Sequence, residues 1–211
     1  MSFKYGDQNV IKNFSYTFRK GNIYFLIGCN GVGKSTLLNL ISGEHINDYT
    51  GSILFNDIDI CKLDICSLRK KNIGFSEQET ILLADTVQNN LELFIKYKDT
   101  LNNYIERLDL LSCISQLDNG IKTLINSQQN NISGGEKQKI SIIRQLLLNP
   151  EVMLFDEPTS ALEIKSKINF MDILREIKKD KIIIIVTHDK MLYNEGEVII
   201  DMNLERESWR N

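Results

Sequence analysis

A glycine-rich loop at residues 28–36 carries the side chains whose chemistry is clearest. An apolar run precedes it at residues 23–27, and a segment with a helical pattern follows at residues 37–41. Glycines let the backbone turn tightly and point successive N–H groups inward, and the following helix presents the positive end of its dipole to the same anion. In this Gly-x4-Gly-Lys-Ser spacing, Lys34 is expected to reach the outer phosphates and Ser35 to bind magnesium. A chance match is the weaker interpretation, because strand, loop and helix occur in the required order.

The phosphate loop supplies most of the candidate nucleotide-binding residues, which are Asn30, Gly31, Gly33, Lys34, Ser35 and Thr36. Cys29 also lies in the loop, at a position that accepts many residue types, so a redox-sensitive thiol is the weaker interpretation there. The remaining cysteines, Cys61, Cys66 and Cys113, show neither Cys-x2-Cys spacing nor a histidine at metal-ligand spacing. We therefore expect four free thiols.

Two acidic residues follow a second apolar run. Residues 152–155 are typical of a buried strand and lead directly into Asp156 and Glu157. Ligands of open α/β sheets bind at the carboxyl ends of the strands, where both carboxylates are expected. We expect Asp156 to hold magnesium through water, and Glu157 to polarise the water that attacks the γ-phosphate. A surface turn with two acids is the alternative, and the phosphate loop upstream disfavours it.

A serine followed by two glycines, Ser133, Gly134 and Gly135, begins a predicted helix at residues 135–148. The Ser133 hydroxyl and the N–H groups after it can all face one phosphate. One nucleotide needs only one cradle, so the second cradle suggests a nucleotide held by another copy. We therefore expect a head-to-tail pair with two shared sites. An ordinary capped helix is the alternative, and it does not explain why one chain has two anion-binding sites.

Length and composition favour one α/β domain with a sizeable core. The chain has 211 residues, of which 42% are hydrophobic and 25% charged. Its net charge of -3 gives no reason to expect nucleic acid as the main partner. The longest strongly apolar run, residues 182–186, is much shorter than the roughly 20 residues that cross a bilayer. Residues 1–4 open no secretory signal, so we expect a soluble, intracellular chain.

The periodicity of apolar residues predicts the elements that position these groups. Antiparallel strands and turns are expected at residues 3–7, 10–11, 14–18 and 51–57, and a short strand at 72–75. Helices are expected at residues 87–97, 101–108 and 135–148, with Thr86, Thr100 and Ser133 as N-caps. Strands return at residues 152–155, 182–186 and 197–201. A helix is expected between the strands at residues 152–155 and 182–186. Its inward apolar face is expected to be formed by Ile164, Ile168, Met171, Leu174 and Ile177.

Taken in order, these motifs resemble the nucleotide-binding domain of an ABC transporter over residues 5–201. The resemblance rests on the phosphate loop, Gln78, the signature at residues 133–136, the acids Asp156 and Glu157, residues 158–163, and Thr187 with His188. It implies an α/β P-loop NTPase core with a mostly parallel sheet, an amino-terminal antiparallel β-layer and an inserted helical subdomain. One ABC ATPase domain is implied over residues 1–211, with an ATP-binding core at 1–78 and 150–211 and a helical signature subdomain at 79–149.

The resemblance also implies roles for single residues. Tyr5 matches the aromatic that stacks on adenine, with Phe3 as a rival. Gln78 matches the residue that contacts magnesium and the attacking water while sensing the membrane domain, and His188 matches the histidine that contacts the γ-phosphate. His45 has no such placement and is expected at the surface. ATP with Mg²⁺ is implied to be sandwiched between the phosphate loop of one subunit and the signature of the other.

The implied function is an ATPase that powers export of a substrate, with a peptide as one candidate. The chain resembles exporter-type domains. The resemblance implies that it acts at the cytoplasmic face, with a membrane-spanning subunit and with a second copy or a paralogous ATPase subunit. Glu136 and Glu163 stand where the family usually has Gln and Asp, and they motivate an alternative, a hydrolysis-poor regulatory subunit of a heterodimer. A soluble ABC protein of translation or DNA maintenance is disfavoured, because the chain has neither a second cassette, long coiled-coil arms nor a basic surface.

Overall fold

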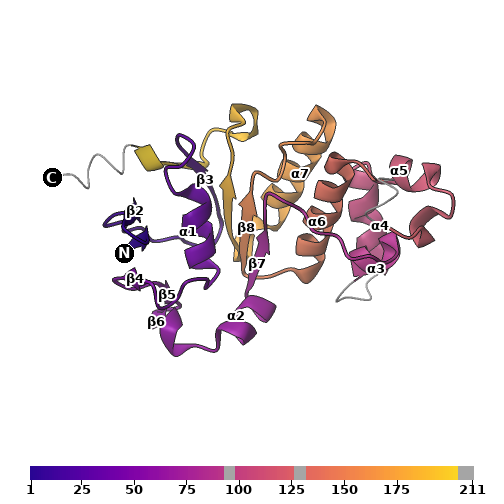
Figure 1. Cartoon of the computed structure of the whole chain (residues 1–211). Coiled ribbons are helices and arrows are strands. Elements are labelled where there is room, and N and C mark those ends of the chain that lie inside the picture. The colour runs from indigo at the N-terminus through magenta and orange to yellow at the C-terminus, as the bar shows by residue number, and fades with distance from the viewer. Residues whose placement is uncertain (93–97, 126–131, 204–211) are drawn as a thin grey trace. The chain divides into compact units, whose positions relative to one another are not determined.

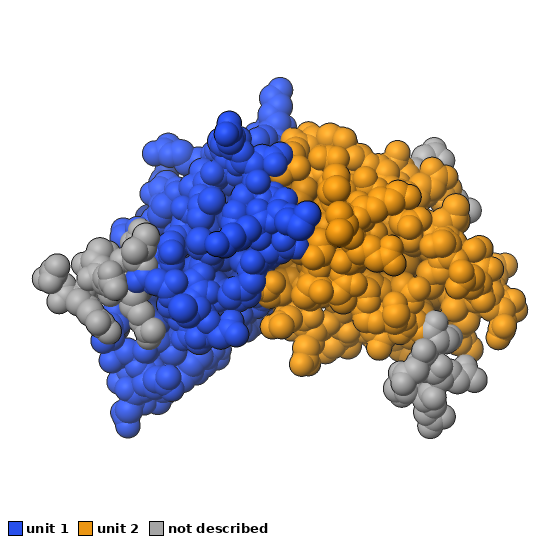
Figure 2. All heavy atoms as spheres, turned by 90° about the horizontal axis from the view of Figure 1, so that it is seen from above, with its two compact units in different colours: residues 1–75, 150–156, 178–211 blue, residues 76–149, 157–177 orange. Residues whose placement is uncertain are grey.

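The computed structural model describes residues 1–92, 98–125 and 132–203 (Figure 1). The chain forms two compact units. Unit 1 contains Met1–Phe75, Pro150–Asp156 and Lys178–Asn211, and unit 2 contains Ser76–Asn149 and Glu157–Ile177 (Figure 2). None of the described helices is both long and apolar enough to cross a membrane.

A five-stranded sheet forms the centre of unit 1, in the order β10-β3-β9-β8-β7. Its strands are β3 (Asn22–Ile27), β7 (Ile73–Ser76), β8 (Val152–Asp156), β9 (Ile182–Val186) and β10 (Val198–Asp201). The pairs β10–β3, β3–β9 and β8–β9 are parallel. All five residues of β8 are buried, as expected for a strand covered on both faces, and this explains why its first four residues are apolar.

A small antiparallel sheet with the order β2-β1-β4 also belongs to unit 1. It contains β1 (Ser2–Tyr5), β2 (Gln8–Ile11) and β4 (Tyr49–Thr50). A separate hairpin joins β5 (Leu54–Phe55) to β6 (Ile58–Asp59) through Asn56 and Asp57, whose φ angles are 49° and 63°. Positive φ at both central residues is typical of a two-residue hairpin turn. The α/β fold, with a parallel sheet and a small antiparallel layer, is therefore confirmed.

The strand expected at residues 14–18 is wrong, because this segment has no regular secondary structure. Its alternating aromatic residues pack on one another instead. The rings of Tyr16 and Phe18 lie 4.9 Å apart, and the Phe18 ring meets that of Tyr24 at 5.0 Å. The alternation of aromatic and polar residues in this segment therefore reflects the packing of its aromatic rings on β3, and not a strand.

The helices of unit 1 are α1 (Lys34–Ile41) and α2 (Ile65–Lys71), with short 3-10 turns η1 (Ile60–Lys62), η3 (Lys178–Asp180) and η4 (Lys190–Leu192). Helix α1 begins directly after the phosphate loop and buries Leu37, Leu38 and Leu40 in the core that contains β3 and β8 residues. Burying a leucine contributes roughly 1.5–3 kcal/mol, so this packing fixes the helix end that faces the loop.

Unit 2 contains the helices α3 (Val87–Glu92), α4 (Lys98–Arg107), α5 (Leu111–Gln116), α6 (Gly134–Leu148) and α7 (Ile164–Ile177), with the turn η2 (Gly120–Lys122). Thr86 is confirmed as a cap, because its hydroxyl accepts the Asn89 N–H at 3.0 Å. Residues 93–97 of the helix predicted after it lie outside the described residues. Thr100 is not a cap, because α4 is already helical at Lys98, so the Thr100 hydroxyl lies inside its first turn.

Helix α6 has the predicted N-cap, Ser133, and its C-cap is Asn149, which is left-handed with a φ of 50°. The apolar face predicted for α7 is partly wrong. Ile164 and Ile168 are 61% and 53% exposed. The buried face is instead formed by Ser166, Phe170, Met171, Ile173 and Leu174. Several spacings in this isoleucine-rich helix satisfy a 3.6-residue period, so periodicity alone did not identify the buried stripe.

Candidate functional site

The phosphate loop of unit 1 holds its lysine tightly. Lys34 is 7% exposed, and its Nζ donates to the carbonyl oxygens of Gly28 at 2.8 Å and Cys29 at 3.1 Å. An ammonium group has three N–H donors, so one remains for an anion. Gly33 caps α1 with a φ of 108° and no side-chain hydrogen bond, which leaves the first N–H groups of α1 without a side-chain acceptor. This arrangement suits an anion at the helix start.

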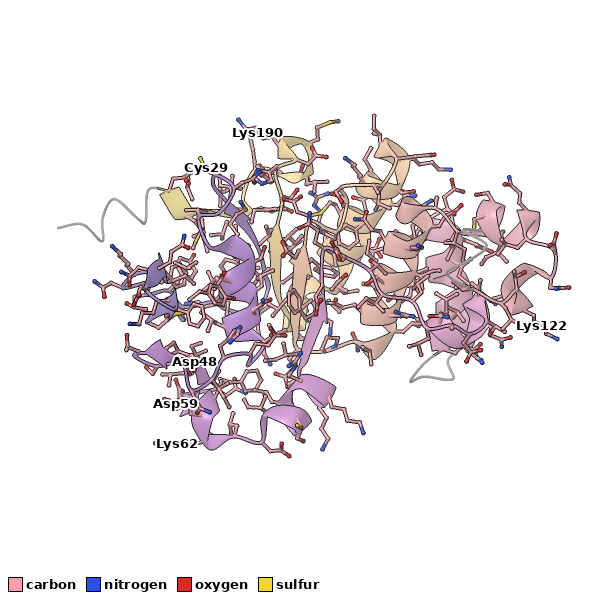
Figure 3. All side chains as sticks on the ribbon, in the orientation of Figure 1. Cys29, Asp48, Asp59, Lys62, Lys122 and Lys190 are labelled. Atoms are coloured by element: carbon pink, nitrogen blue, oxygen red, sulfur yellow. The ribbon has the colours of Figure 1, made fainter. Side chains whose placement is uncertain are left out.

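Several other loop residues are exposed to a ligand, whereas Gly33 is buried. Asn30, Gly31 and Ser35 are exposed, and Thr36 is half-buried. Cys29 is exposed as well, and Figure 3 shows it at the same end of unit 1 as Lys190, which follows β9. His188 is also exposed and comes just after β9, so it lies at the carboxyl edge of the parallel sheet. Its contact with a γ-phosphate stays a prediction.

A contact that sequence reasoning missed closes the phosphate loop. The side-chain oxygen of Asn203 accepts the Cys29 N–H at 3.2 Å, and the Asn203 N–H donates to Asp201 Oδ1 at 2.9 Å. Asn203 follows β10, which pairs with β3 in the sheet. Only the strand order places it beside the loop, so no sequence motif signals its role.

Asp156 lies beside the loop with the chemistry of a cation ligand. It is 5% exposed and accepts a hydrogen bond from the Ser35 hydroxyl. Burial raises the pKa of the Asp156 carboxyl, and the Ser35 hydroxyl and the Lys34 charge partly offset that rise. Its Oδ1 is buried, with no hydrogen-bond partner among the described residues.

Hydroxyl and carboxylate oxygens are ligands that Mg²⁺ prefers, so Ser35 and Asp156 fit this ion. Within the described ranges, no cluster of three or more His, Cys, Asp or Glu side chains is arranged to hold a metal. A site made from a hydroxyl, one carboxylate and phosphate oxygens needs no such cluster.

Glu157, the first residue of the unit 2 segment that follows β8, has an uncommon backbone conformation. Its φ is 48°, which costs a non-glycine residue of order 1 kcal/mol or more and which surrounding contacts must maintain. The Glu157 carbonyl oxygen accepts N–H bonds from Ser160 at 3.3 Å and from the Gln138 side chain at 3.3 Å. The half-buried Glu157 therefore begins a tight turn that is fastened to α6.

The signature residues form a complete capping box in unit 2. The Ser133 hydroxyl accepts the Glu136 N–H at 3.3 Å, and the Glu136 carboxylate accepts the Ser133 N–H at 2.6 Å. Ser133 and Gly134 are exposed, so their polar groups can meet an anion. Burial raises the pKa of Glu136, but hydrogen bonds from Cys113 and Ser133 outweigh it and the pKa is lowered. Its charge is thus held by the protein's own donors.

Gly135 is required by close packing. A Cβ at this position would lie 2.6 Å from the carbonyl oxygen of Ala161. At Gly134 the same atom would meet nothing within 4 Å. The second glycine thus lets α6 lie directly against the segment that follows Glu157.

The aromatic rivals for adenine stacking differ in exposure. Phe3 is 3% exposed, so its faces are enclosed, whereas Tyr5 is 47% exposed. The Tyr5 ring lies edge-on to Phe3 at 4.8 Å and to His45 at 5.6 Å. His45 is at the surface, as predicted, and these contacts give it a packing role beside Tyr5. Phe3 is therefore unsuitable, and Tyr5 stays the prediction.

Gln78 lies in unit 2, in an exposed segment just after β7. The structure thus joins Lys34, Ser35 and Asp156 in one cluster of unit 1, and Gln138 with Glu157 in one cluster of unit 2. Sequence reasoning missed Gln138. All four cysteines are free, as predicted.

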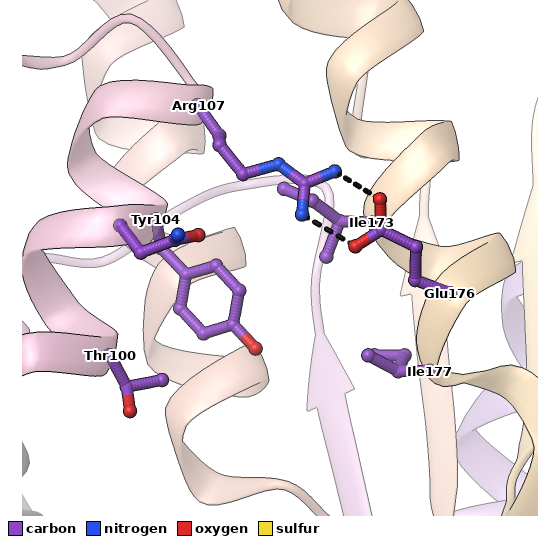
Figure 4. Close-up of a pocket in the computed structure, with 7 residues that line it drawn as sticks. Thr100, Tyr104, Arg107, Ile173, Glu176 and Ile177 are labelled. Atoms are coloured by element: carbon purple, nitrogen blue, oxygen red, sulfur yellow. Dashed lines mark hydrogen bonds and ion pairs between the residues drawn. The ribbon is translucent and has the colours of Figure 1, made fainter.

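A pocket of about 440 Å³ in unit 2 contains none of the predicted site residues. It lies between α4 and α7 and is lined by Thr100, Asn103, Tyr104, Arg107, Ile173, Glu176 and Ile177. The Arg107 guanidinium donates to both carboxylate oxygens of Glu176, at 2.6 and 2.8 Å (Figure 4). This ion pair fastens α4 to α7 and has a structural role.

Comparisons with known proteins identify the family. A family model described as ABC transporter matches residues 11–160. The multidrug resistance-like ATP-binding protein MdlA of Buchnera aphidicola subsp. Baizongia pistaciae is 36% identical over 209 residues, which cover 95% of this chain and 35% of that protein. An ATP-dependent lipid A-core flippase of Syntrophus aciditrophicus is 34% identical, over 89% of this chain and 31% of that protein.

A solved structure shares the fold. A bacterial Atm1-family ABC exporter with ATP bound superposes with a TM-score of 0.85 at 24% identity, over 98% of this chain and 38% of that one. The chain spans about a third of the length of these relatives. It belongs to the ABC transporter family, as an ATPase domain of that family.

Proposed function

We propose that the chain binds ATP with Mg²⁺ and hydrolyses it to drive export of a substrate through a membrane-spanning subunit. The observation that carries this proposal is the cluster of Lys34, Ser35 and Asp156 at the start of α1. A buried ammonium, a hydroxyl and a buried carboxylate, next to helix N–H groups that have no side-chain cap, provide what a triphosphate and its cation require.

Each part of the nucleotide has a proposed partner. The exposed Tyr5 ring stacks on adenine, and Asn30, Gly31, Gly33, Lys34, Ser35 and Thr36 hold the phosphates. Ser35, Asp156 and Gln78 hold Mg²⁺, which supplies charge neutralisation at the phosphates when bound. Glu157 orients and polarises the attacking water, with Gln78 and His188 on the reacting phosphate.

We further propose that two copies, or this chain and a paralogous ATPase subunit, share each nucleotide. Ser133, Gly134 and Gly135 of one subunit then complete the site formed by the phosphate loop of the other. The exposed hydroxyl and N–H groups at the start of α6 support this assignment, since they form an anion-binding helix start. The proposed division is an ATP-binding core at residues 1–78 and 150–211 and a helical signature subdomain at 79–149.

The membrane partner is proposed from the relatives. Their names describe a multidrug resistance-like ATP-binding protein and a lipid A-core flippase, and both are about three times as long as this chain. We propose that a separate membrane-spanning subunit provides the translocation path and that the chain works at the cytoplasmic face. A peptide is the proposed cargo class, and a transport assay with the reconstituted complex tests it.

Replacement of Glu157 by Gln tests the catalytic assignment. The change preserves size but removes the base, so we expect kcat for ATP to fall by about 10²-fold or more while ATP still binds. Glu195→Gln is the matched control, because Glu195 is an exposed carboxylate near the carboxyl end of the chain. Phosphate release gives kcat, and a fluorescent ATP analogue gives Kd. Parental turnover in Glu157→Gln would remove Glu157 from this role.

The hydrolysis-poor alternative makes a different prediction for the parent chain. The Glu136 carboxylate accepts hydrogen bonds from the Ser133 N–H and Cys113, so it serves as part of the cap of α6. Because Lys34, Ser35 and Asp156 form the phosphate cluster whatever residue stands at 136, we expect measurable basal ATP turnover. A parent that binds ATP tightly without turnover, alone and with its membrane subunit, would favour the alternative.

A further inference from the structure

Gln138, on the second turn of α6, makes three hydrogen bonds to the segment that begins with Glu157. Its Nε2 donates to the Glu157 carbonyl oxygen at 3.3 Å and to the Ser160 hydroxyl at 2.7 Å. Its Oε1 accepts the Ala161 N–H at 3.0 Å. The side chain is 8% exposed, so these bonds are shielded from water. One amide thus holds three points of a single turn.

Close packing reinforces the same contact. The space for a Cβ at Gly135 is filled by the Ala161 carbonyl oxygen, only 2.6 Å from where that atom would be. Two features of α6 therefore converge on residues 157–161, and both lie in unit 2. The helix that begins at the signature and the segment that begins at Glu157 form one packed body.

The backbone conformation of Glu157 must be maintained by contacts with neighbouring residues. Its left-handed backbone is uncommon for a residue with a side chain, and such a conformation persists only where neighbouring contacts determine it. The Gln138 bond to the Glu157 carbonyl acts on the peptide group whose orientation depends on this conformation. The direction of the Glu157 side chain follows from the same backbone angles.

We propose that Gln138 is a positioning residue for ATP hydrolysis, which fixes the backbone of Glu157 and so aims its carboxylate at the attacking water. This inference rests on the proposed function, because it assumes that Glu157 acts on that water. It adds that the helix whose start is presented to a partner's nucleotide also positions the base for the chain's own nucleotide.

Two variants of Gln138 test the proposal in the full chain. Gln138→Ala removes all three hydrogen bonds. Gln138→Glu keeps an acceptor for Ala161 but replaces both donations by a carboxylate oxygen facing the Glu157 carbonyl. Since misplacement of a catalytic group by about 1 Å costs roughly 10²-fold in rate, we expect kcat to fall by about tenfold to a hundredfold in both variants. The KM for ATP should change by less than about threefold, because the phosphate loop is untouched.

Asn169→Ala is the matched control. The Asn169 amide on α7 donates to the Arg107 carbonyl oxygen at 2.6 Å, so its loss removes a side-chain tether within unit 2 that does not touch residues 157–161. We expect Asn169→Ala to lower Tm, by less than Gln138→Ala does, and to keep the parental kcat. An equal loss of kcat in the control would show a merely structural role and overturn the proposal.

Hydrogen exchange provides a readout besides activity. The Ala161 amide should exchange faster in Gln138→Ala and not in Asn169→Ala, because only the first loses its acceptor. If Gln138→Ala does not fold, Ser160→Ala removes one of the three bonds, with Ser160→Thr expected to restore kcat through its hydroxyl. Faster exchange with parental kcat would overturn the positioning role while leaving the proposed function intact. A parent without ATP turnover in any setting would contradict the proposed function, and the role of Gln138 would fall with it.

Discussion

Gly135 and Gly134 are neighbours on α6, and alanine at each should have opposite effects on stability. A Cβ on Gly135 would lie 2.6 Å from the Ala161 carbonyl oxygen, about 0.8 Å short of the 3.4 Å at which ordinary van der Waals contact begins. The obstructing atom belongs to backbone held by Gln138, so it cannot rotate away. Overpacking of this kind costs about 1–3 kcal/mol.

Alanine also favours a helix, and this gain must be subtracted. At a compatible helical position, Gly→Ala stabilises by about 0.4–1 kcal/mol. Gly135→Ala should therefore lose about 1–2 kcal/mol, which for a chain of this length lowers Tm by about 2–8 °C. Gly134→Ala has open space around its Cβ and should gain about 0.4–1 kcal/mol, a rise of about 1–4 °C.

Thermal and urea unfolding of the chain without nucleotide measure both changes. Circular dichroism at a helix-sensitive wavelength follows the loss of helical structure as the chain unfolds. A Gly135→Ala variant as stable as Gly134→Ala would refute the reasoning, because it would show that α6 and residues 157–161 do not pack as described.

Two further substitutions test the metal and the capping box. Asp156→Asn should remove the increase in ATP affinity that Mg²⁺ provides, and EDTA should lower the ATP affinity of the parent to that of the variant. Binding titrations with and without Mg²⁺ measure both effects. An unchanged response to Mg²⁺ in the variant would exclude Asp156 as a ligand. Glu136→Gln weakens the capping box and should cost about 0.5 kcal/mol at pH 7. Because hydrogen bonds lower the pKa of Glu136 in the folded chain, its stabilisation is present above the unfolded pKa of about 4.3 and is lost as the pH falls through the folded pKa. Urea unfolding at several pH values should show parent and variant converging in acid, and a constant gap would contradict the assignment.

Local patterns predicted the elements with strong signals. The buried runs at β3, β8 and β9 formed parallel strands, because a strand covered on both faces is apolar throughout. The cap Ser133 and the stop at Asn149 and Pro150 placed α6 within one residue. The pattern after the phosphate loop predicted a helix at residues 37–41, and α1 begins three residues earlier, at Lys34.

Long-range packing accounts for what the patterns missed. Asn203 reaches Cys29 only because β10 pairs with β3, and Gln138 reaches Glu157 only because α6 packs on the segment after β8. Neither residue has a local signal for these roles. The buried stripe of α7 depends on which helices it packs against, and α4 contacts it. Tertiary packing, rather than propensity, decides such positions.

The central claim, that two copies share ATP between the phosphate loop and the signature helix, is tested most directly by the mass of Glu157→Gln in solution. Multi-angle light scattering with Mg²⁺ and ATP should show twice the mass of the 24.3 kDa chain, returning to one chain when ATP is removed or when Lys34→Ala is added. A particle that stays at one chain while saturated with ATP would contradict sharing between two copies of this chain.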